Sequence, residues 1–229
     1  MKRIAVFSDI HGNLEALESI LKDIERNNID EVIYLGDIIG LGPSPKECLD
    51  IIMDSRIKMI KGNHEIYQID ESNMKPTMKE HRDWINSLLD EKELDYIANL
   101  PMTYEELING KLFTFSHFFF DETKTSFQPF GILEDNRVYD IARNVETDYM
   151  FLGHFHDNFQ ISNGSLYTCP GSSGLRKDNI TFYTIVEIEE KNVRITRKDL
   201  EYDRKAFEKK MKQIDYPRKD ELNEMFFGV

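Results

Sequence analysis

The chain has 229 residues, which suffices for one hydrophobic core and is short for two independently folded domains. Hydrophobic residues make up 40% and charged residues 31%, proportions typical of a globular protein rather than a disordered one. The formal net charge of -13 gives a surface that repels long polyanions, so binding to long DNA or RNA is not expected. A small anionic substrate stays compatible with this charge, because bound cations can dominate the field inside a site.

Cysteine content and hydropathy indicate the compartment. The two cysteines, Cys48 and Cys169, are too few for a disulfide framework, and we expect reduced thiols, with Cys169 as a buried structural thiol rather than a soft metal ligand. The apolar run at the N-terminus ends at Asp9 and His11, too soon for a signal peptide. No stretch approaches the length of a membrane span, so we expect a cytoplasmic protein without a membrane partner.

The first third of the chain predicts a β-α-β-α-β unit. Three short apolar runs are expected as buried strands, at residues 3–8, 32–35 and 57–60. Two helical patterns lie between them, the first capped by Asn13 and the second opened by a capping box at 44–47. Parallel crossovers place the carboxyl ends of such strands at one edge of a sheet. The polar loops that follow the three strands should therefore lie together.

The middle of the chain alternates helices with strands. Apolar periodicity predicts helix, strand, helix and strand in turn, at residues 77–100, 113–116, 134–144 and 149–152. The pattern then changes to hairpins, the first around the turn signal Asn163-Gly164 and the second pairing 182–188 with 193–197. A charged amphipathic helix over 204–214 ends the series, packed on its own sheet or on a second subunit, which leaves the oligomeric state open.

Polar residues with metal-binding side chains gather where the predicted strands end. Five of the six histidines follow strands, and only His81 falls inside a predicted helix, where we expect it in solvent. Any one such residue is more often a cap or a turn residue, but the whole set is hard to explain in that way. The candidate ligands are Asp9, His11, Asp37, Asn63, His117, His154 and His156.

The types and number of these ligands predict two metal ions. Imidazole together with carboxylate suits Mn, Fe, Zn or Co. A single catalytic zinc takes about three protein ligands, so seven candidates exceed the needs of one ion. Two neighbouring cations can activate a water molecule and clamp the oxygens of a phosphate ester. The sequence therefore predicts a two-metal hydrolase of phosphate esters.

Five sequence blocks, in this order, resemble the calcineurin-like metallophosphoesterases. They are Asp9-x-His11, Gly36-Asp37, Gly62-Asn63-His64-Glu65, His117 and Gly153-His154-x-His156. The resemblance implies an α/β fold, a four-layer α/β/β/α sandwich of two mixed β-sheets flanked by helices. It also implies one domain over residues 1–200 with a helical, cap-like insertion at about 66–100. Residues 201–229 would then form a C-terminal helix and tail packed on the same domain.

The resemblance assigns a role to each ligand. It implies that Asp9, His11 and His156 hold the first metal and that Asn63, His117 and His154 hold the second. Asp37 would bridge both ions. His64 would contact the phosphate and, as an imidazolium near neutral pH, protonate the leaving oxygen. Asp37 and His64 are thus the expected catalytic residues.

Departures from the family pattern narrow the function. Members that dephosphorylate Ser and Thr in proteins carry an Asp and an Arg after the Gly-Asp block, whereas residues 36–42 here read Gly-Asp-Ile-Ile-Gly-Leu-Gly. This stretch looks like the small bacterial and archaeal phosphodiesterase branch. That branch shows Asn-Pro-Gly-Ser near its end, where this chain has Cys-Pro-Gly-Ser at 169–172. Arg176 follows closely and is a candidate substrate contact beside Asn63 and His64, although a surface arginine is the alternative.

We therefore expect an enzyme that hydrolyses small phosphate esters with a metal-activated hydroxide. Phosphodiesters come first, and dinucleoside polyphosphates, cyclic diesters and phosphomonoesters are further candidates. The alternative is a catalytically weak scaffold or regulatory protein of the same fold. Proteins of that kind have degraded metal motifs, whereas the set is intact here, including His64.

Overall fold

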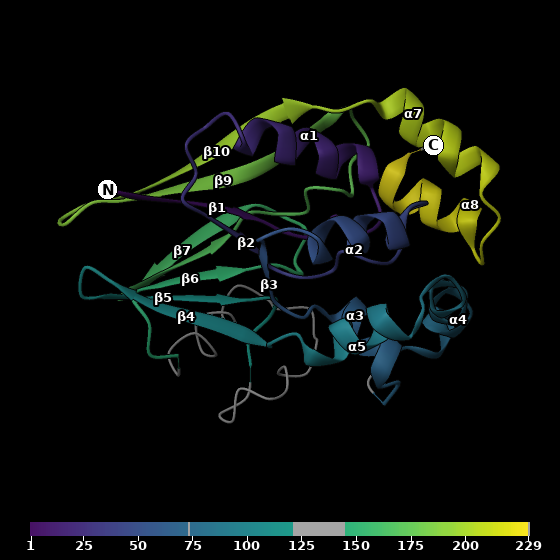
Figure 1. The fold of residues 1–229 in the computed structure, drawn as a ribbon, viewed down its shortest axis with the longest axis horizontal. Coiled ribbons are helices and arrows are strands. Elements are labelled where there is room, and N and C mark those ends of the chain that lie inside the picture. Colours follow the sequence, from purple (N-terminus) through teal and green to yellow (C-terminus); the bar gives the residue numbers. More distant parts are fainter. Residues whose placement is uncertain (73, 121–144, 229) are drawn as a thin grey trace.

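The computed structural model of the protein describes residues 1–72, 74–120 and 145–228 (Figure 1). Two five-stranded mixed sheets form its centre, with strand orders β10-β9-β1-β2-β3 and β4-β5-β6-β8-β7. The predicted α/β fold with two mixed sheets is confirmed. The helix predicted at 134–144 lies outside the described residues.

The first sheet contains the three strands predicted from the first third of the chain. Its parallel strands are β1 (Lys2–Phe7), β2 (Glu31–Tyr34) and β3 (Lys58–Met59). The hairpin of β9 (Ile180–Ile188) and β10 (Val193–Glu201) extends the sheet antiparallel on the other side of β1. The carboxyl ends of the parallel strands meet at one edge, as the β-α-β-α-β order requires.

The second sheet is also parallel at its centre. Its strands, in chain order, are β4 (Thr103–Ile108), β5 (Lys111–Ser116), β6 (Tyr149–Leu152), β7 (Phe159–Asn163) and β8 (Ser165–Cys169). β5, β6 and β8 run parallel, so the residues after β5 and β6 leave the sheet side by side. The sequence analysis missed β4, although Asn109-Gly110, with both φ angles positive, is the same hairpin signal as Asn163-Gly164.

Helices cover the outer face of the first sheet (Figure 1). They are α1 (Leu14–Ile24) and α2 (Pro45–Met53), and α7 (Arg204–Gln213) packs against α1 beyond the end of β10. Asn13 caps α1 as predicted, because its side chain accepts from the N–H of Ala16 at 3.1 Å. The capping box predicted for α2 is wrong. Its N-cap, Ser44, makes no capping hydrogen bond with its side chain, and Pro45 begins the helix through its restricted φ alone.

A second group of helices packs on α2 at the end of the sheets (Figure 1). It comprises α3 (Asn63–Ile69), the short 3-10 helix η1 (Pro76–Met78), α4 (Lys79–Leu88) and α5 (Glu91–Asn99). The chain closes with α8 (Lys219–Leu222) and the π-helical turn η2 (Asn223–Phe227). Within the described residues, no helix has the length and apolar character needed to cross a membrane.

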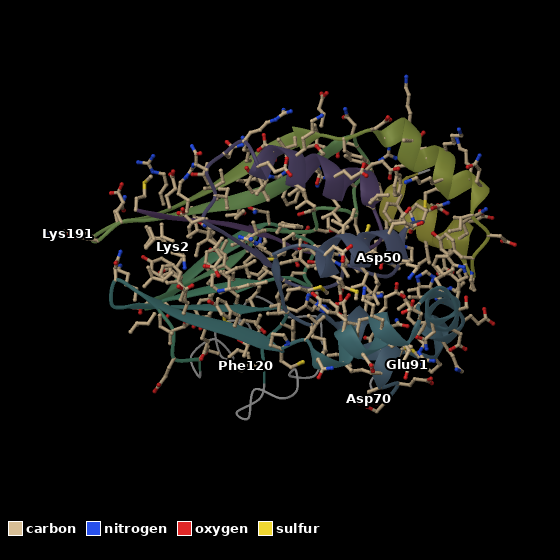
Figure 2. The ribbon with its side chains drawn as sticks, viewed as in Figure 1. Lys2, Asp50, Asp70, Glu91, Phe120 and Lys191 are labelled. Carbon is tan, nitrogen blue, oxygen red and sulfur yellow. The ribbon has the colours of Figure 1, made fainter. Side chains whose placement is uncertain are left out.

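Apolar side chains from both sheets fill the space between them (Figure 2). Ile4, Val6 and Ile33 project from the first sheet and are fully buried. From the second sheet, Phe115 and Phe151 stack with ring centroids 5.2 Å apart. Burying each such side chain stabilises the fold by about 1.5–3 kcal/mol, so this layer holds the edges of the two sheets, with their loops, firmly together. Both cysteines are free and buried, as expected.

Candidate metal centre

The loops after β1 and β2 are tied together through their backbones. The N–H of Asp9 donates to the carbonyl of Gly36 at 3.1 Å, and that of His11 to the carbonyl of Asp37 at 3.0 Å. Backbone conformation here is unusual, since five of the seven candidate ligands have φ between 48° and 67°, a region that non-glycine residues rarely adopt. These five are Asp9, His11, Asp37, His154 and His156.

Two glycines allow this crowding. A Cβ atom on Gly62 would lie 2.2 Å from Oδ1 of Asp37. One on Gly153 would lie 2.3 Å from Oγ of Ser8 and 2.9 Å from Nδ1 of His117. No larger residue fits at either position without moving a candidate ligand or the residue beside it. Glycine in these two motif blocks therefore allows the candidate ligands to approach the backbone closely.

Asp9, His11 and His156 form a first group of donor atoms. Oδ1 of Asp9 lies 3.7 Å from Nε2 of His11 and 3.5 Å from Nε2 of His156, and the two Nε2 atoms are 3.4 Å apart. Oδ1 of Asp9 is buried and has no hydrogen-bond partner within the described residues. A cation bonded at about 2.1 Å to tetrahedral ligands holds their donor atoms about 3.4 Å apart. The spacing and chemistry of this group therefore fit a metal ion.

A second group lies beside the first. Oδ1 of Asn63 is 3.0 Å from Nε2 of His117 and 2.8 Å from Nδ1 of His154. Nδ1 of His117 donates to the carbonyl of Leu35 at 2.8 Å, which leaves Nε2 facing the centre, as is usual for metal-ligating histidines. Oδ2 of Asp37 lies 3.3 Å from Nε2 of His117 and 3.7 Å from Nε2 of His11, so this carboxylate sits between the two groups.

The two buried carboxylates stay ionised because imidazoles surround them. Burial alone would raise the pKa of Asp9, but His11 and His156 hold it well below its usual range. Burial would likewise raise the pKa of Asp37, and its imidazole neighbours, His117 first, lower it. The centre therefore offers two negative charges and several imidazole nitrogens at one place, a donor set suited to divalent cations.

Glu65 is a buried carboxylate beside the centre to which the sequence had assigned no role. Its carboxylate is fully buried, and Oε2 accepts from the N–H groups of Gly62 and Asp37, each at 2.8 Å. Oε1 accepts from the N–H of Ile38 at 3.0 Å. Burial and the neighbouring Asp37 raise the pKa of Glu65 to about 7. The glutamate thus links two loops, the one that contains Asp37 and the one that follows β3. Its position in the Gly-Asn-His-Glu block was the sequence signal that could have identified it.

His64 borders the open part of the centre. It is 9% exposed, and its backbone N–H donates to Oδ1 of Asp37 at 2.8 Å. Its ring lies 4.8 Å from that of His11. Burial lowers the pKa of His64 to about 3, so the ring is neutral at neutral pH in this geometry, unlike the imidazolium expected from the sequence. The negative charge of a bound phosphate beside the ring would raise this pKa.

The expectation that His81 lies in solvent is wrong. Its side chain is 1% exposed, and Nε2 accepts from the N–H of Leu41 at 2.9 Å. The ring packs against Trp84 and Tyr216, with centroids 5.5 Å and 5.4 Å away. His81, Trp84 and Ile85 are spaced by three and four residues along α4, so they share the buried face of the helix, and this spacing was readable in the sequence.

A cavity of about 590 Å³ opens onto the two groups and borders Asp37, Asn63, His64, His154 and His156. Its outer walls come from two segments far apart in the chain: Tyr67, Lys75, Thr77 and Met78, and then Arg218, Leu222, Met225 and Phe226. Arg176, the candidate substrate contact, lies instead on a neighbouring cavity of about 340 Å³ that His156 also lines. Its guanidinium is paired with Asp178 at 2.7 Å.

Comparison with known proteins agrees with this geometry. The family model for the calcineurin-like phosphoesterases matches residues 2–158, and the chain belongs to this family of metal-dependent phosphoester hydrolases. The chain is 31% identical to the uncharacterized protein MJ0912 of Methanocaldococcus jannaschii, over 91% of this chain and 92% of the relative. The predicted family is thereby confirmed.

Two further likenesses are more limited. A metallophosphoesterase from Sphaerobacter thermophilus shares the fold, with a TM-score of 0.74 and 24% identity over 96% of each chain. A stretch of 65 residues is 32% identical to the symmetrical bis(5'-nucleosyl)-tetraphosphatase of Actinobacillus pleuropneumoniae, covering 27% of this chain and 24% of that protein.

Proposed function

We propose that the protein hydrolyses phosphodiesters of small molecules with two metal ions bound at the candidate centre. The observation that carries the proposal is the position of Asp37. Its Oδ2 atom lies within 3.7 Å of a histidine from each donor group, where one carboxylate can serve two cations. Asp9, His11 and His156 would hold one ion, and Asn63, His117 and His154 the other. Mn, Fe, Zn and Co all suit such a mixture of nitrogen and oxygen ligands.

Each group of residues would contribute one part of the reaction. When bound, the cations would supply Lewis acidity, which lowers the pKa of a water molecule and offsets the negative charge of the phosphate. Asn63 and His64, which border the cavity, would contact the phosphate oxygens. Nδ1 of His64 faces Gly40, where a Cβ atom would lie only 2.4 Å from it. Nε2 is therefore the atom that would carry the proton to the leaving oxygen.

Several features favour a small substrate over a phosphoprotein. The Asp and Arg of the protein phosphatase branch are absent, and Gly40 and Leu41 stand in that stretch. A cavity of about 590 Å³ lies within the range for small-molecule sites. The short likeness to a bis(5'-nucleosyl)-tetraphosphatase supports dinucleoside polyphosphates among the candidate substrates. The alternative of an inactive scaffold is disfavoured because His64 stands at the cavity with both donor groups beside it.

Hydrolysis of bis-p-nitrophenyl phosphate by metal-stripped protein tests the proposal. Mn, Mg, Zn or no metal is added back, and His64→Ala is assayed in parallel with its bound metal measured by mass spectrometry. We expect turnover to return with metal, and His64→Ala to keep its metals while losing about 10²- to 10⁴-fold in rate. If no metal restores hydrolysis of this diester or of p-nitrophenyl phosphate, the proposed phosphoesterase activity is ruled out and the scaffold alternative takes its place.

A further inference from the structure

The last part of the chain closes one side of the catalytic cavity. We call residues 216–228 the C-terminal segment; it contains α8 and η2, drawn in yellow in Figure 1. Four of its side chains line the cavity that holds His64: Arg218, Leu222, Met225 and Phe226. The segment lies outside residues 2–158, the part of the chain that the family model matches. It is therefore a place where this chain can set its own substrate preference.

Contacts to distant elements hold the segment in position. Arg204, at the start of α7, donates to the carbonyl of Phe227 at 2.6 Å and to that of Asp178 at 2.9 Å. The hydroxyl of Tyr216 donates to the carbonyl of Leu41 at 2.8 Å. Phe227 itself is fully buried. Because both ends are anchored, the side chains between them occupy fixed positions above the centre.

Packing within the protein leaves two apolar side chains of the segment partly uncovered. Met225 is 55% exposed, although a methionine side chain usually packs against other apolar groups. Phe226 is only partly buried, and its ring lies 6.2 Å from the ring of His156, nearly perpendicular at 77°. Both residues line the large cavity and its smaller neighbour. They form an apolar surface next to a candidate metal ligand, where an organic group of the substrate has to lie.

A lysine from the other lining segment adds a charge to this surface. Lys75 lines the same cavity, and its ammonium group has no ion-pair or hydrogen-bond partner within residues 1–72, 74–120 and 145–228. Arg218 differs, since its Nε donates to Glu221 at 2.8 Å. In a chain with a net charge of -13, an unpaired ammonium group at the mouth of the cavity favours a substrate with an additional negative charge.

We infer that the C-terminal segment selects the substrate, with Phe226 and Met225 contacting an aromatic ester group and Lys75 contacting a second anionic group. A substrate that satisfies both is a nucleotide ester with more than one phosphate. The base stacks on Phe226 while one phosphate lies between Asp37 and His64. Stacking of a base on an aromatic side chain tolerates any base sequence and strengthens binding about tenfold. This inference rests on the proposed hydrolysis and adds its substrate class.

Two phosphodiesters that share a leaving group distinguish substrate selection by the C-terminal segment from the hydrolysis step itself. The p-nitrophenyl ester of thymidine 5'-monophosphate and methyl p-nitrophenyl phosphate release the same phenol and differ only in the other ester group. With metal-loaded wild-type protein we expect kcat/KM for the thymidine ester to exceed that for the methyl ester. Phe226→Ala should reduce this ratio about tenfold, and Phe226→Leu should reduce it nearly as much, because leucine restores volume without a ring.

Leu107→Ala is the matched control, since Leu107 is a 71% exposed apolar residue on β4 that does not line the cavity. It should leave both rates unchanged. Lys75→Gln is tested by inhibition of the methyl ester reaction with ADP and AMP, and it should reduce the preference for ADP about threefold, as expected for an exposed charge. Metal content and melting temperature of each variant show that it is folded.

The outcomes are distinct. Failure of wild-type protein to hydrolyse either ester with any metal overturns the proposed function itself. Hydrolysis of both esters with a ratio that Phe226→Ala leaves unchanged overturns only the inference. A wild-type preference for octyl p-nitrophenyl phosphate over the thymidine ester also overturns it, because the surface would then select an alkyl chain. If Lys75→Gln keeps the wild-type preference for ADP over AMP, Lys75 does not contact a second anionic group of the substrate.

Discussion

His81 should make the stability of the protein depend on pH. Its Nε2 atom accepts a hydrogen bond from Leu41 and can do so only while the ring is neutral. Burial lowers the pKa of His81 to about 4, with smaller contributions from His11 and Arg218. In the unfolded chain a histidine has a pKa of about 6.5. Folding therefore favours the neutral ring.

The sign and size of the effect follow from these two pKa values. Because the pKa of His81 in the folded protein is depressed, its stabilising contribution is present above about pH 6.5 and is lost as the pH falls towards about 4. By linkage, lowering the pH from about 7.5 to about 5.5 should remove about 1.3 kcal/mol from the free energy of unfolding through this residue alone.

Urea denaturation of the wild-type protein and of His81→Gln at the two pH values measures this contribution. Glutamine can accept the Leu41 hydrogen bond but does not titrate. Other titrating groups occur in both proteins, so they cancel in the difference between the two pH dependences. We expect wild-type protein to lose about 1.3 kcal/mol more than the variant. Equal losses in the two proteins would refute the reasoning, since His81 would then bind its proton equally well folded and unfolded.

Two further substitutions test the centre. Asp37→Asn should weaken the binding of both metal ions in calorimetric titrations, because its Oδ2 atom faces both donor groups, and loss of one ion alone would contradict a bridging position. Glu65→Gln turns one acceptor of the Asp37 loop into an amide N–H that faces backbone N–H groups, and should lower the free energy of unfolding by about 1–3 kcal/mol. A change in urea midpoint within error would show that Glu65 does not fix the loop.

Sequence reasoning succeeded where local patterns determine structure. Apolar runs at 3–8 and 32–35 are strands because buried parallel strands show continuous hydrophobic residues. The order of these strands then requires Asp9 and Asp37 to leave the sheet at one edge, and their loops are in fact hydrogen-bonded to each other. The proximity of Asp9 and Asp37 therefore follows from strand order alone, whereas the position of His117, His154 and His156 beside them, after strands of the second sheet, was implied by the family resemblance.

Residues whose roles depend on distant contacts were missed. The spacing of His81 with Trp84 and Ile85 indicates the buried face of α4, but nothing near His81 in the sequence shows that Tyr216, from the C-terminal segment, covers its ring. Met225 and Phe226 could not be placed at the cavity for the same reason. The strand β4 is half exposed and carries two glutamates, so it lacks the apolar run by which the other strands of its sheet were found. Long-range packing places Tyr216, Met225 and Phe226, and local periodicity does not contain that information.

The left-handed backbone of five candidate ligands has a consequence for the evolution of stability in this protein. Each such conformation is unfavourable by about 1–3 kcal/mol for a residue other than glycine. Replacement by glycine at Asp9 or His156 would relieve that cost, and so a protein selected for thermal stability without activity should lose its ligands at these positions first. Keeping a histidine or an aspartate there means that the fold tolerates a permanent local cost in order to aim a donor atom at the centre.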